Sequence, residues 1–422
     1  MKMTKYKLGE LVEVTRGASL SGQFYAEEGK LIRLTLGNFN MNGGGFKENT
    51  SKTDLYFTGT VRDEFILNKG DIITPLTEQS LGLLGTTARI PESGKYIQSQ
   101  DVALVRCKEG LLDPNFCYYL ISSSIVRQQL SAAAQQTKIR HTSPEKIKDS
   151  TVWVPDFETQ KSIGRILTDI DNKIAVNRQI NDNLEAMAKQ LYDYWFVQFD
   201  FPNEEGKPYK SSGGAMVWNE KLKREIPQGW SGVSLKDLAL TSRNAITPVE
   251  NEVYQHFSIP SFDACGSYSL DNGSDIKSDK FVLQKGQLLV SKLNPWFNRV
   301  VWVPKGTNMI GSTEFVVLNP NNESESGYIY SVIKSPKFIA YCSQAATGTS
   351  HSQRRVSPDV LMAFKVVYEQ GVVQKYGCLI EKIQKQQAEL LSEIAMLTKQ
   401  RDELLPLLMN GQATINYHLS AC

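Results

Sequence analysis

Two loop segments carry side chains that could bind nucleic acid. Segment 135–142 reads Gln-Gln-Thr-Lys-Ile-Arg-His-Thr, and segment 347–355 reads Thr-Gly-Thr-Ser-His-Ser-Gln-Arg-Arg. Both combine hydroxyl and amide groups with Lys or Arg, and neither contains an acidic residue. Arginine and lysine suit guanine and phosphate, whereas glutamine suits adenine. An ordinary solvated loop is the alternative for either segment alone, and the occurrence of the pattern in both segments weakens that alternative.

A second pair of segments follows two Lys-Gly turns. Segment 75–80 reads Pro-Leu-Thr-Glu-Gln-Ser, and segment 291–299 reads Ser-Lys-Leu-Asn-Pro-Trp-Phe-Asn-Arg. They are alike in position but unlike in residues, so two related folds could read two different targets. The DNA-binding candidates are Thr77, Gln79, Gln136, Lys138 and Arg140 in the first half of the chain, and Lys292, Asn294, Asn298, Arg299, Ser350, Gln353, Arg354 and Arg355 in the second.

Catalytic motifs are not evident in the sequence. The stretch from Gly22 to Lys30 has the wrong spacing for a Walker A loop, and Leu31 stands where Ser or Thr is needed. Segment 294–297 is similar to the loop with which amino-methyltransferases hold a flipped adenine, but Trp stands at its third position, so a structural turn is favoured. The six cysteines form no CxxC pair. We therefore expect no catalytic residue, no metal site and no cofactor in this chain.

The composition is that of an ordinary globular protein. The chain has 422 residues, of which 41% are hydrophobic, and a formal net charge of +2. This charge balance means that any nucleic-acid binding must come from local basic loops. No apolar run approaches the length of about 18 residues that a membrane span needs, and the N-terminus lacks a signal-peptide pattern. We expect a cytoplasmic, multi-domain protein that does not bind membranes.

The chain repeats itself. Segment 65–73, Phe-Ile-Leu-Asn-Lys-Gly-Asp-Ile-Ile, recurs 216 residues later as Phe-Val-Leu-Gln-Lys-Gly-Gln-Leu-Leu at 281–289. Segment 143–145, Ser-Pro-Glu, recurs 214 residues later as Ser-Pro-Asp at 357–359. A nearly constant offset across separated blocks predicts two copies of one structural unit. Each copy begins with short apolar runs typical of strands and turns, and each ends in a long helical segment.

Apolar residues spaced alternately by three and four predict two long helices, at 157–199 and 371–411. Each would be roughly 60 Å long, which is more than one small domain can cover. We expect the helices to pack antiparallel as a coiled coil, and burial of each helix in its own domain is the alternative. Asn177 and Asn181 fall on the same stripe, where they either fix the register or face solvent. The expected seam residues are Ile163, Leu167, Ile170, Ile174, Leu184 and Leu191 in the first helix, and Ile383, Leu390, Ile394, Leu397 and Leu404 in the second.

These patterns together predict an α+β fold. Two similar α/β domains are joined by two long antiparallel helices, as a pseudo-two-fold internal repeat. Two-fold DNA-binding dimers read half-sites about 34–36 Å apart or multiples of that distance, and here the helices would act as the spacer. The expected segments are a domain at 1–156, a helix at 157–199, a linker at 200–228, a domain at 229–370, a helix at 371–411 and a tail at 412–422.

Several long stretches of the chain carry a family resemblance. They are Asn-Arg-Gln-Ile-Asn-Asp-Asn-Leu-Glu-Ala-Met-Ala at 177–188, Trp-Phe-Val-Gln-Phe-Asp-Phe-Pro at 195–202, Arg-Glu-Ile-Pro-Gln-Gly-Trp at 224–230 and Arg-Asp-Glu-Leu-Leu-Pro-Leu-Leu-Met-Asn-Gly-Gln at 401–412. With them the chain resembles, over essentially its whole length, the specificity (S) subunits of type I restriction–modification enzymes.

The resemblance implies a non-catalytic subunit for DNA recognition and assembly. Such subunits carry two target-recognition domains, each of which reads one half of a bipartite, asymmetric site on double-stranded DNA. They bind two modification subunits, which methylate adenine with S-adenosylmethionine, and restriction subunits, which use ATP and Mg²⁺. Two alternatives from other classes are a self-sufficient methyltransferase or nuclease and a coiled-coil scaffold that does not bind DNA.

Overall fold

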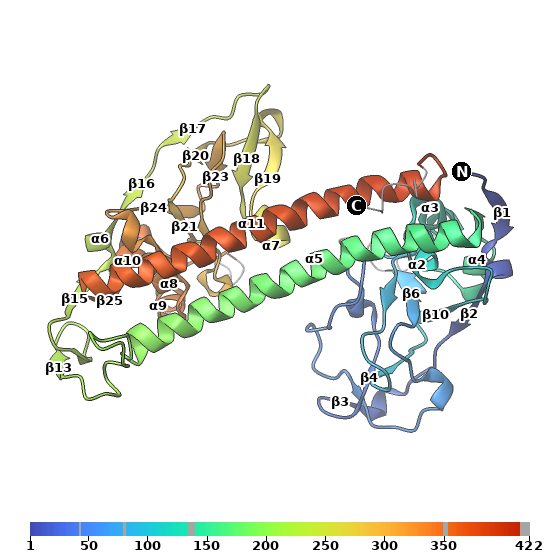
Figure 1. Cartoon of the computed structure of the whole chain (residues 1–422), viewed down its shortest axis with the longest axis horizontal. Helices are drawn as coiled ribbons and strands as arrows, with labels where there is room; N and C mark the ends of the chain where they lie inside the picture. Colours follow the sequence, from blue (N-terminus) through green and yellow to red (C-terminus); the bar gives the residue numbers. More distant parts are fainter. Residues whose placement is uncertain (42–43, 79–81, 134–139, 349–352, 414–422) are drawn as a thin grey trace. The chain divides into compact units, whose positions relative to one another are not determined.

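The computed structural model describes residues 1–41, 44–78, 82–133, 140–348 and 353–413 (Figure 1). The chain forms two compact units, of which unit 1 comprises Met1–Asn177 and Glu393–Cys422, and unit 2 comprises Arg178–Ser392. Each unit contains a part of both long helices, α5 (Phe157–Tyr192) and α11 (Gln370–Met409). A π-helical turn, Asp193–Val197, extends α5.

Unit 1 is built on an antiparallel four-stranded sheet of order β2-β10-β6-β8. A second sheet of order β3-β5-β4-β9 contains one parallel pair, β4 with β9, and strands β1 and β12 pair separately. The strands are β1 (Thr4–Lys7), β2 (Val12–Arg16), β3 (Tyr25–Ala26), β4 (Leu31–Arg33), β5 (Tyr56–Phe57), β6 (Ile72–Pro75), β7 (Thr77–Glu78), β8 (Ala88–Arg89), β9 (Tyr96–Ile97), β10 (Val102–Cys107), β11 (Arg140–His141) and β12 (Thr151–Val154), and the helices before α5 are α1 (Leu8–Leu11), α2 (Pro114–Ser122), α3 (Ser124–Ala133) and α4 (Pro144–Lys148).

Unit 2 repeats this arrangement. Its antiparallel four-stranded sheet has the order β16-β24-β21-β22, its separate pair is β15 with β25, and its larger sheet, β17-β20-β23-β18-β19, again contains one parallel pair, β18 with β23. The strands are β15 (Ser231–Ser234), β16 (Ala239–Ser242), β17 (Ala245–Ile246), β18 (Val253–Phe257), β19 (Ser269–Asn272), β20 (Lys280–Val282), β21 (Leu288–Ser291), β22 (Val300–Trp302), β23 (Met309–Gly311), β24 (Phe315–Pro320) and β25 (Lys365–Tyr368), and the helices before α11 are α6 (Leu235–Leu238), α7 (Ile259–Cys265), α8 (Ser326–Lys334), α9 (Pro336–Ala345) and α10 (Pro358–Met362).

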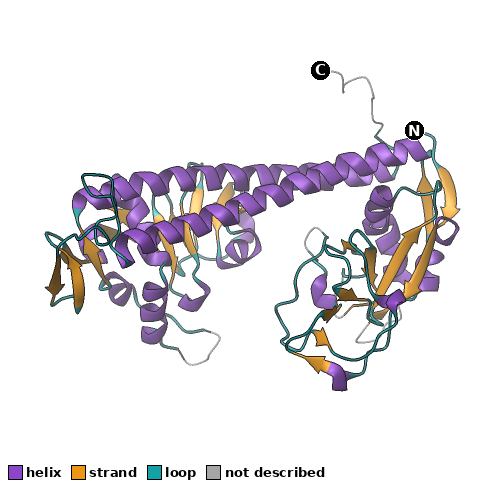
Figure 2. Cartoon of the chain, turned by 60° about the horizontal axis from the view of Figure 1, so that its bottom comes forward, coloured by secondary structure: helices purple, strands orange, loops and turns teal. Residues whose placement is uncertain are grey.

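The matching order of elements confirms the predicted internal repeat and the α+β fold class. Both units proceed from a short strand and a one-turn helix, through two sheets, to a helix pair, a short helix and a strand that leads into a long helix. In each unit these elements lie against that unit's portion of the long helices (Figure 2). Between the repeats, a hairpin of β13 (Met216–Asn219) and β14 (Arg224–Pro227) forms part of the connecting segment.

Local sequence explains where the recurring short helices begin. Ser143 and Ser357 are the N-caps of α4 and α10, and each side-chain oxygen accepts a hydrogen bond from a backbone N–H in the first turn. Proline follows both serines at the first helical position, where its missing N–H costs nothing. The Ser-Pro-acid motif found in both repeats is therefore a helix start, and it places the segments just before it, which include the candidate residues.

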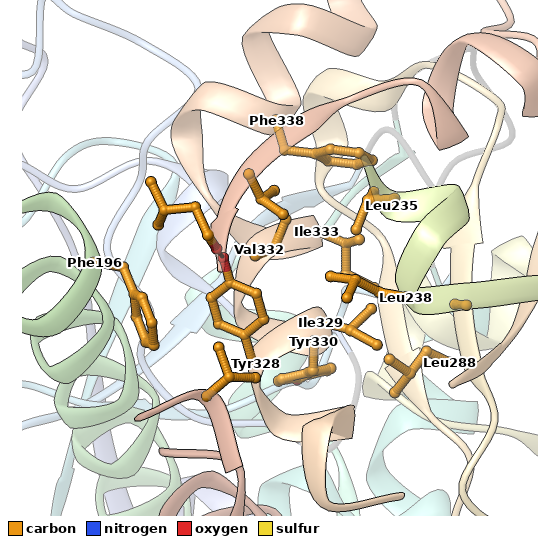
Figure 3. Close-up of a cluster of buried hydrophobic side chains, with 14 of the residues drawn as sticks. Phe196, Leu235, Leu238, Leu288, Tyr328, Ile329, Tyr330, Val332, Ile333 and Phe338 are labelled. Carbon is orange, nitrogen blue, oxygen red and sulfur yellow. Dashed lines mark hydrogen bonds between the residues drawn. The ribbon is translucent and has the colours of Figure 1, made fainter. Parts of the chain in front are cut away.

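Aromatic side chains dominate the core of unit 2. Figure 3 shows Phe196, at the end of the first long helix, facing Tyr328 of α8, with ring centres 4.6 Å apart. Phe196 also meets Tyr376 of α11 edge-on at 5.0 Å. Tyr328 is fully buried, and its hydroxyl donates a hydrogen bond to the carbonyl oxygen of Val367. Both long helices are thus anchored in the core of this unit.

Within unit 1 the two long helices run antiparallel. Arg401 Nη1 of α11 lies 2.9 Å from Asp171 Oδ1 of α5, and Lys173 Nζ lies 3.4 Å from Glu393 Oε1. Asn177 Nδ2 donates a hydrogen bond of 2.7 Å to Glu393 Oε2. The partners on α11 move toward lower numbers as those on α5 move toward higher numbers, which is the pattern of an antiparallel pair.

The helix portions in unit 2 follow the same antiparallel pattern. Gln387 Nε2 donates to the backbone carbonyl of Asn181 at 3.3 Å, and the Tyr376 hydroxyl donates to the carbonyl of Ala188 at 3.4 Å. Lys334 of α8 forms an ion pair with Glu185 of α5, with Nζ and Oε1 2.5 Å apart. The helices are therefore paired through polar groups as well as apolar ones.

The seam contains more polar residues than the apolar stripe suggested. Asn177, Gln387 and Arg401 are buried at seam positions, and Asn181 is half-buried. Asn177 therefore faces the helix pair and not solvent. Of the expected apolar seam residues, the buried ones are Ile163, Leu167, Ile174 and Leu184, and the half-buried ones are Ile170, Leu191, Ile383, Leu390, Ile394, Leu397 and Leu404.

Candidate nucleic-acid interface

In unit 1 the two candidate segments meet. Strand β7 pairs antiparallel with β11, so that Arg140 lies opposite Glu78 and His141 opposite Thr77. The Thr142 N–H donates to the carbonyl of Leu76 at 2.8 Å and extends this ladder. Gln79, Gln136 and Lys138 lie outside the described residues.

Glu78 is the anchor of this ladder. Its side chain is only 2% exposed, and Oε2 accepts hydrogen bonds from the backbone N–H groups of Gly82, Leu83 and Leu84 at 3.1, 2.9 and 3.0 Å. Its other oxygen, Oε1, lies 3.1 Å from Nη1 of Arg140. A buried carboxylate is tolerated when it is paired and hydrogen-bonded, and both conditions are met here.

Arg140 connects the ladder to helix α3. Its Nη2 donates to the carbonyl oxygen of Ser131, near the end of α3, and lies 3.0 Å from the Ser131 hydroxyl. With Glu78 on one side and Ser131 on the other, the guanidinium is held in place and contributes to the shape of the loop. Thr77 is buried beside it. In this arrangement His141 is the exposed residue of β11.

Unit 2 builds the same ladder with different residues. Leu293 and Thr347 both bridge to Arg355, and Asn294 exchanges hydrogen bonds with the backbone of Arg354 at 2.8 and 3.0 Å. Arg354 Nη2 donates to the carbonyl of Ala346 at the end of α9, at 2.5 Å. Arg354 thus occupies the place of Arg140, and the Asn294 amide takes the place of the Glu78 carboxylate. Ser350 lies outside the described residues.

Arg299 has a structural partner. Its guanidinium forms a two-point ion pair with Asp263 of α7, with distances of 2.6 Å from Nε to Oδ1 and 2.8 Å from Nη2 to Oδ2. The Arg299 side chain is 8% exposed and lies 4.5 Å from the centre of the Phe297 ring. Arg299 therefore supports the loop from beneath. Asn298, next to it, is half-buried with a left-handed backbone at φ 49°.

The remaining candidates of unit 2 are more accessible. Arg355 is 45% exposed and pairs with Glu314 at 3.0 Å, and this hydrogen bond raises the pKa of Arg355 above its ordinary value. Gln353 is exposed and Lys292 is half-buried. Because Arg355 and Gln353 are exposed on the ladder, they are the described candidates of this unit best placed to contact a ligand.

Sequence reasoning missed the acidic partners of these arginines. Glu78 lay inside a candidate segment but was not singled out, and Glu314 aligned with Asp101 in the repeat. Both therefore had a positional signal. Asp263 belongs to α7, has no counterpart in the repeated blocks and gave none. The carboxylates explain why these basic loops add little net charge.

The described residues hold no other obvious site. Among them no group of three or more His, Cys, Asp or Glu side chains could hold a metal ion. In the same part of the chain no helix is both long and apolar enough to cross a membrane.

Comparison with known proteins places the chain in a family. The type I restriction modification DNA specificity domain matches residues 1–186. The MjaIX specificity subunit of Methanocaldococcus jannaschii is 22% identical over 325 residues, covering 73% of this chain and 71% of that protein. The HindI specificity subunit of Haemophilus influenzae is 32% identical over 109 residues, covering 25% and 23%. The crystal structure of a type I S subunit from M. genitalium has the same fold, with a TM-score of 0.62 and 17% identity over 97% of this chain and 96% of that one. The chain belongs to the family of specificity subunits of type I restriction–modification systems.

Proposed function

We propose that this chain reads DNA sequence and assembles a type I restriction–modification complex, in which each unit reads one half of a bipartite, asymmetric site. One observation carries the proposal. Both units present the same two-segment ladder on the same frame, yet Glu78 and Arg140 in unit 1 are replaced by Asn294 and Arg354 in unit 2. One scaffold with two different ladders suits the reading of two different half-sites.

The charge distribution supports local contacts to DNA. The chain has a net charge of only +2, so it is not a protein that coats nucleic acid through a general positive field. Phosphate contacts position a protein on the duplex, while contacts to base edges carry the sequence information. We propose that Gln353 and Arg355 make base or phosphate contacts, and that Arg140, Arg354 and Arg299 hold the loops in shape.

The proposal assigns all catalysis to other chains. As a specificity subunit of a multisubunit restriction enzyme, this chain is not itself an enzyme. Two modification subunits would methylate adenine with S-adenosylmethionine, and restriction subunits would use ATP and Mg²⁺ to translocate and cleave double-stranded DNA. The complex would act in the cytoplasm. The long helices would set the spacing between the two half-sites.

Selection from random DNA tests the proposal. The full chain, assembled with its modification subunits, is incubated with duplexes that contain a long randomised region, and the bound DNA is sequenced. The proposal predicts enrichment of two short, unlike motifs separated by a fixed gap. Binding without any enriched motif would contradict DNA reading and favour a scaffold. Methyl transfer by the chain alone would favour a self-sufficient enzyme.

A further inference from the structure

Two consecutive aromatic side chains are exposed beside the ladder of unit 2. The one-turn 3₁₀ helix Pro295–Phe297 presents Trp296 and Phe297, which are 40% and 56% exposed, with ring centres 6.0 Å apart. Single exposed apolar residues are common on protein surfaces. Two adjacent large rings on a candidate DNA-binding loop are less easily explained, because their burial would be favourable and nothing in unit 2 covers them within the described residues.

The backbone of this turn is held in shape from both ends. Asn294 and Asn298 flank it with φ of 48° and 49°, a left-handed conformation that asparagine tolerates better than most residues. The Phe297 N–H donates to the Asn294 carbonyl and the Asn298 N–H to the Pro295 carbonyl, both at 3.0 Å. Pro295 is buried, which anchors the turn in the body of the unit. The two rings therefore project from a fixed base.

Phe297 also rests on a fixed cation. The Arg299 guanidinium lies 4.5 Å from its ring centre and is held by the two-point ion pair with Asp263. Because Asp263 already binds Arg299, this guanidinium cannot swing away from Phe297 without breaking the pair. The ring is thus supported on one side while more than half of it stays in contact with solvent.

Cationic groups share the ladder from which the turn projects. Arg354 is tied to Asn294, at the start of the turn, and Arg355 bridges to Leu293. Lys292 lies two residues before Asn294 in the chain. Apolar side chains flanked by cations are the combination with which many DNA-bending proteins insert a wedge between two base pairs.

We propose that Trp296 and Phe297 form an apolar wedge that enters duplex DNA at one base step of the half-site read by unit 2 and unstacks that step. This inference rests on the proposed DNA-reading function and adds a distortion to it. The 216-residue offset aligns these aromatics with Ser80 and Leu81, so unit 1 has no aromatic pair at the matching sequence positions. The unstacking is therefore confined to one half-site.

A fluorescent base analogue tests the wedge. The selected duplex is prepared with 2-aminopurine at one position at a time across both half-sites, and each duplex is bound by the full chain assembled with its modification subunits. Unstacking raises the fluorescence of this analogue. The wedge predicts a several-fold rise at one step of one half-site, and no rise for the Trp296→Ala/Phe297→Ala double variant.

Affinity gives an independent readout. Stacking of aromatic side chains on bases corresponds to about 1–3 kcal/mol per base, so the double variant should bind roughly 5- to 150-fold more weakly. Its dependence on salt should not change, because no phosphate contact is lost. Trp218→Ala is the matched control, because Trp218 is 58% exposed but lies on the hairpin strand β13. This control should leave both the fluorescence and the affinity unchanged.

The outcomes separate the wedge from the proposed function. Sequence-specific binding with quiet fluorescence at every step would overturn the wedge and leave DNA reading intact. Loss of the modification subunits from the double variant on gel filtration would make this surface a protein contact and would also overturn the wedge. Absence of any sequence-specific binding by the unaltered complex would overturn both.

Discussion

Asn177 donates a hydrogen bond of 2.7 Å to the Glu393 carboxylate across the two long helices, although 216 residues separate them in the chain. Asn177 is 2% exposed, and Lys173 supplies a positive charge 3.4 Å from the other oxygen of Glu393. A polar pair in an otherwise apolar seam favours one alignment of two helices, at some cost in stability. These residues therefore fix the register of the helix pair in unit 1.

Replacement of Asn177 by Asp places two carboxylates side by side. We expect Asn177→Asp to lower the free energy of unfolding by about 1–2 kcal/mol at pH 8, because like charges at this distance repel. The loss should shrink toward pH 5, where one of the two carboxylates takes up a proton. Thermal unfolding at both pH values measures the effect. Asn177→Leu is the control and should not lower the stability. Equal unfolding temperatures for the Asp and Leu variants would contradict the role of this pair.

Glu78 should control one half-site. We expect Glu78→Ala to abolish selective binding to the half-site of unit 1, because three backbone N–H groups and Arg140 lose their acceptor. Leaving a buried ion pair with one partner costs about 3–5 kcal/mol. Glu78→Gln keeps an oxygen for the N–H groups and should have a smaller effect. Binding is measured with duplexes in which one half-site at a time is scrambled. Equal loss at both half-sites would argue against separate reading by the two units.

Buried tyrosines should make unit 2 sensitive to alkali. Burial raises the pKa of Tyr328 and of Tyr376, and burial together with the hydrogen bond to Glu325 raises the pKa of Tyr368 to about 12. The folded unit keeps these phenols neutral, whereas the unfolded chain ionises them near pH 10. Stability from these groups is therefore complete below pH 10 and falls as the pH rises above it, by up to about 1.4 kcal/mol per pH unit for each fully buried tyrosine.

Urea unfolding at pH 9, 10 and 11 measures this slope. Tryptophan fluorescence reports mainly on unit 2, which contains Trp195, Trp218, Trp230, Trp296 and Trp302 of the six tryptophans. We expect Tyr376→Phe to flatten the fall above pH 10, because phenylalanine cannot ionise. A slope that is the same in the variant and the unaltered chain would show that Tyr376 is not a source of the alkaline sensitivity.

The spacer role of the helices predicts a change in the gap between half-sites. One heptad is inserted between Asn177 and Arg178 and a second between Ser392 and Glu393, at the boundaries of the two units, so that the contacts within each unit are retained. Seven residues add about 10 Å of helix, or about three base pairs. The selected motifs should keep their sequences while the gap lengthens. An unchanged gap would contradict the spacer role, and insertion into one helix alone is the control that should disrupt binding.

Sequence patterns were sufficient for the architecture but not for the contacts of the candidate residues. The constant offset between Ser143-Pro144 and Ser357-Pro358 predicted the repeat because both pairs start equivalent helices. The restraint of Arg140 could not be read in the same way, since it depends on the register of β7 against β11, more than 60 residues apart. A search for apolar spacing also passes over Gln387 and Arg401, which are buried in the seam because they bind polar partners.

A genome-wide map of methylated adenine, in the host with and without this gene, tests the central claim most directly. The account predicts that removal of the gene abolishes methylation at one bipartite, asymmetric motif and at no other. A map that keeps every methylated motif after the gene is removed, while the modification subunits are still produced, would contradict it.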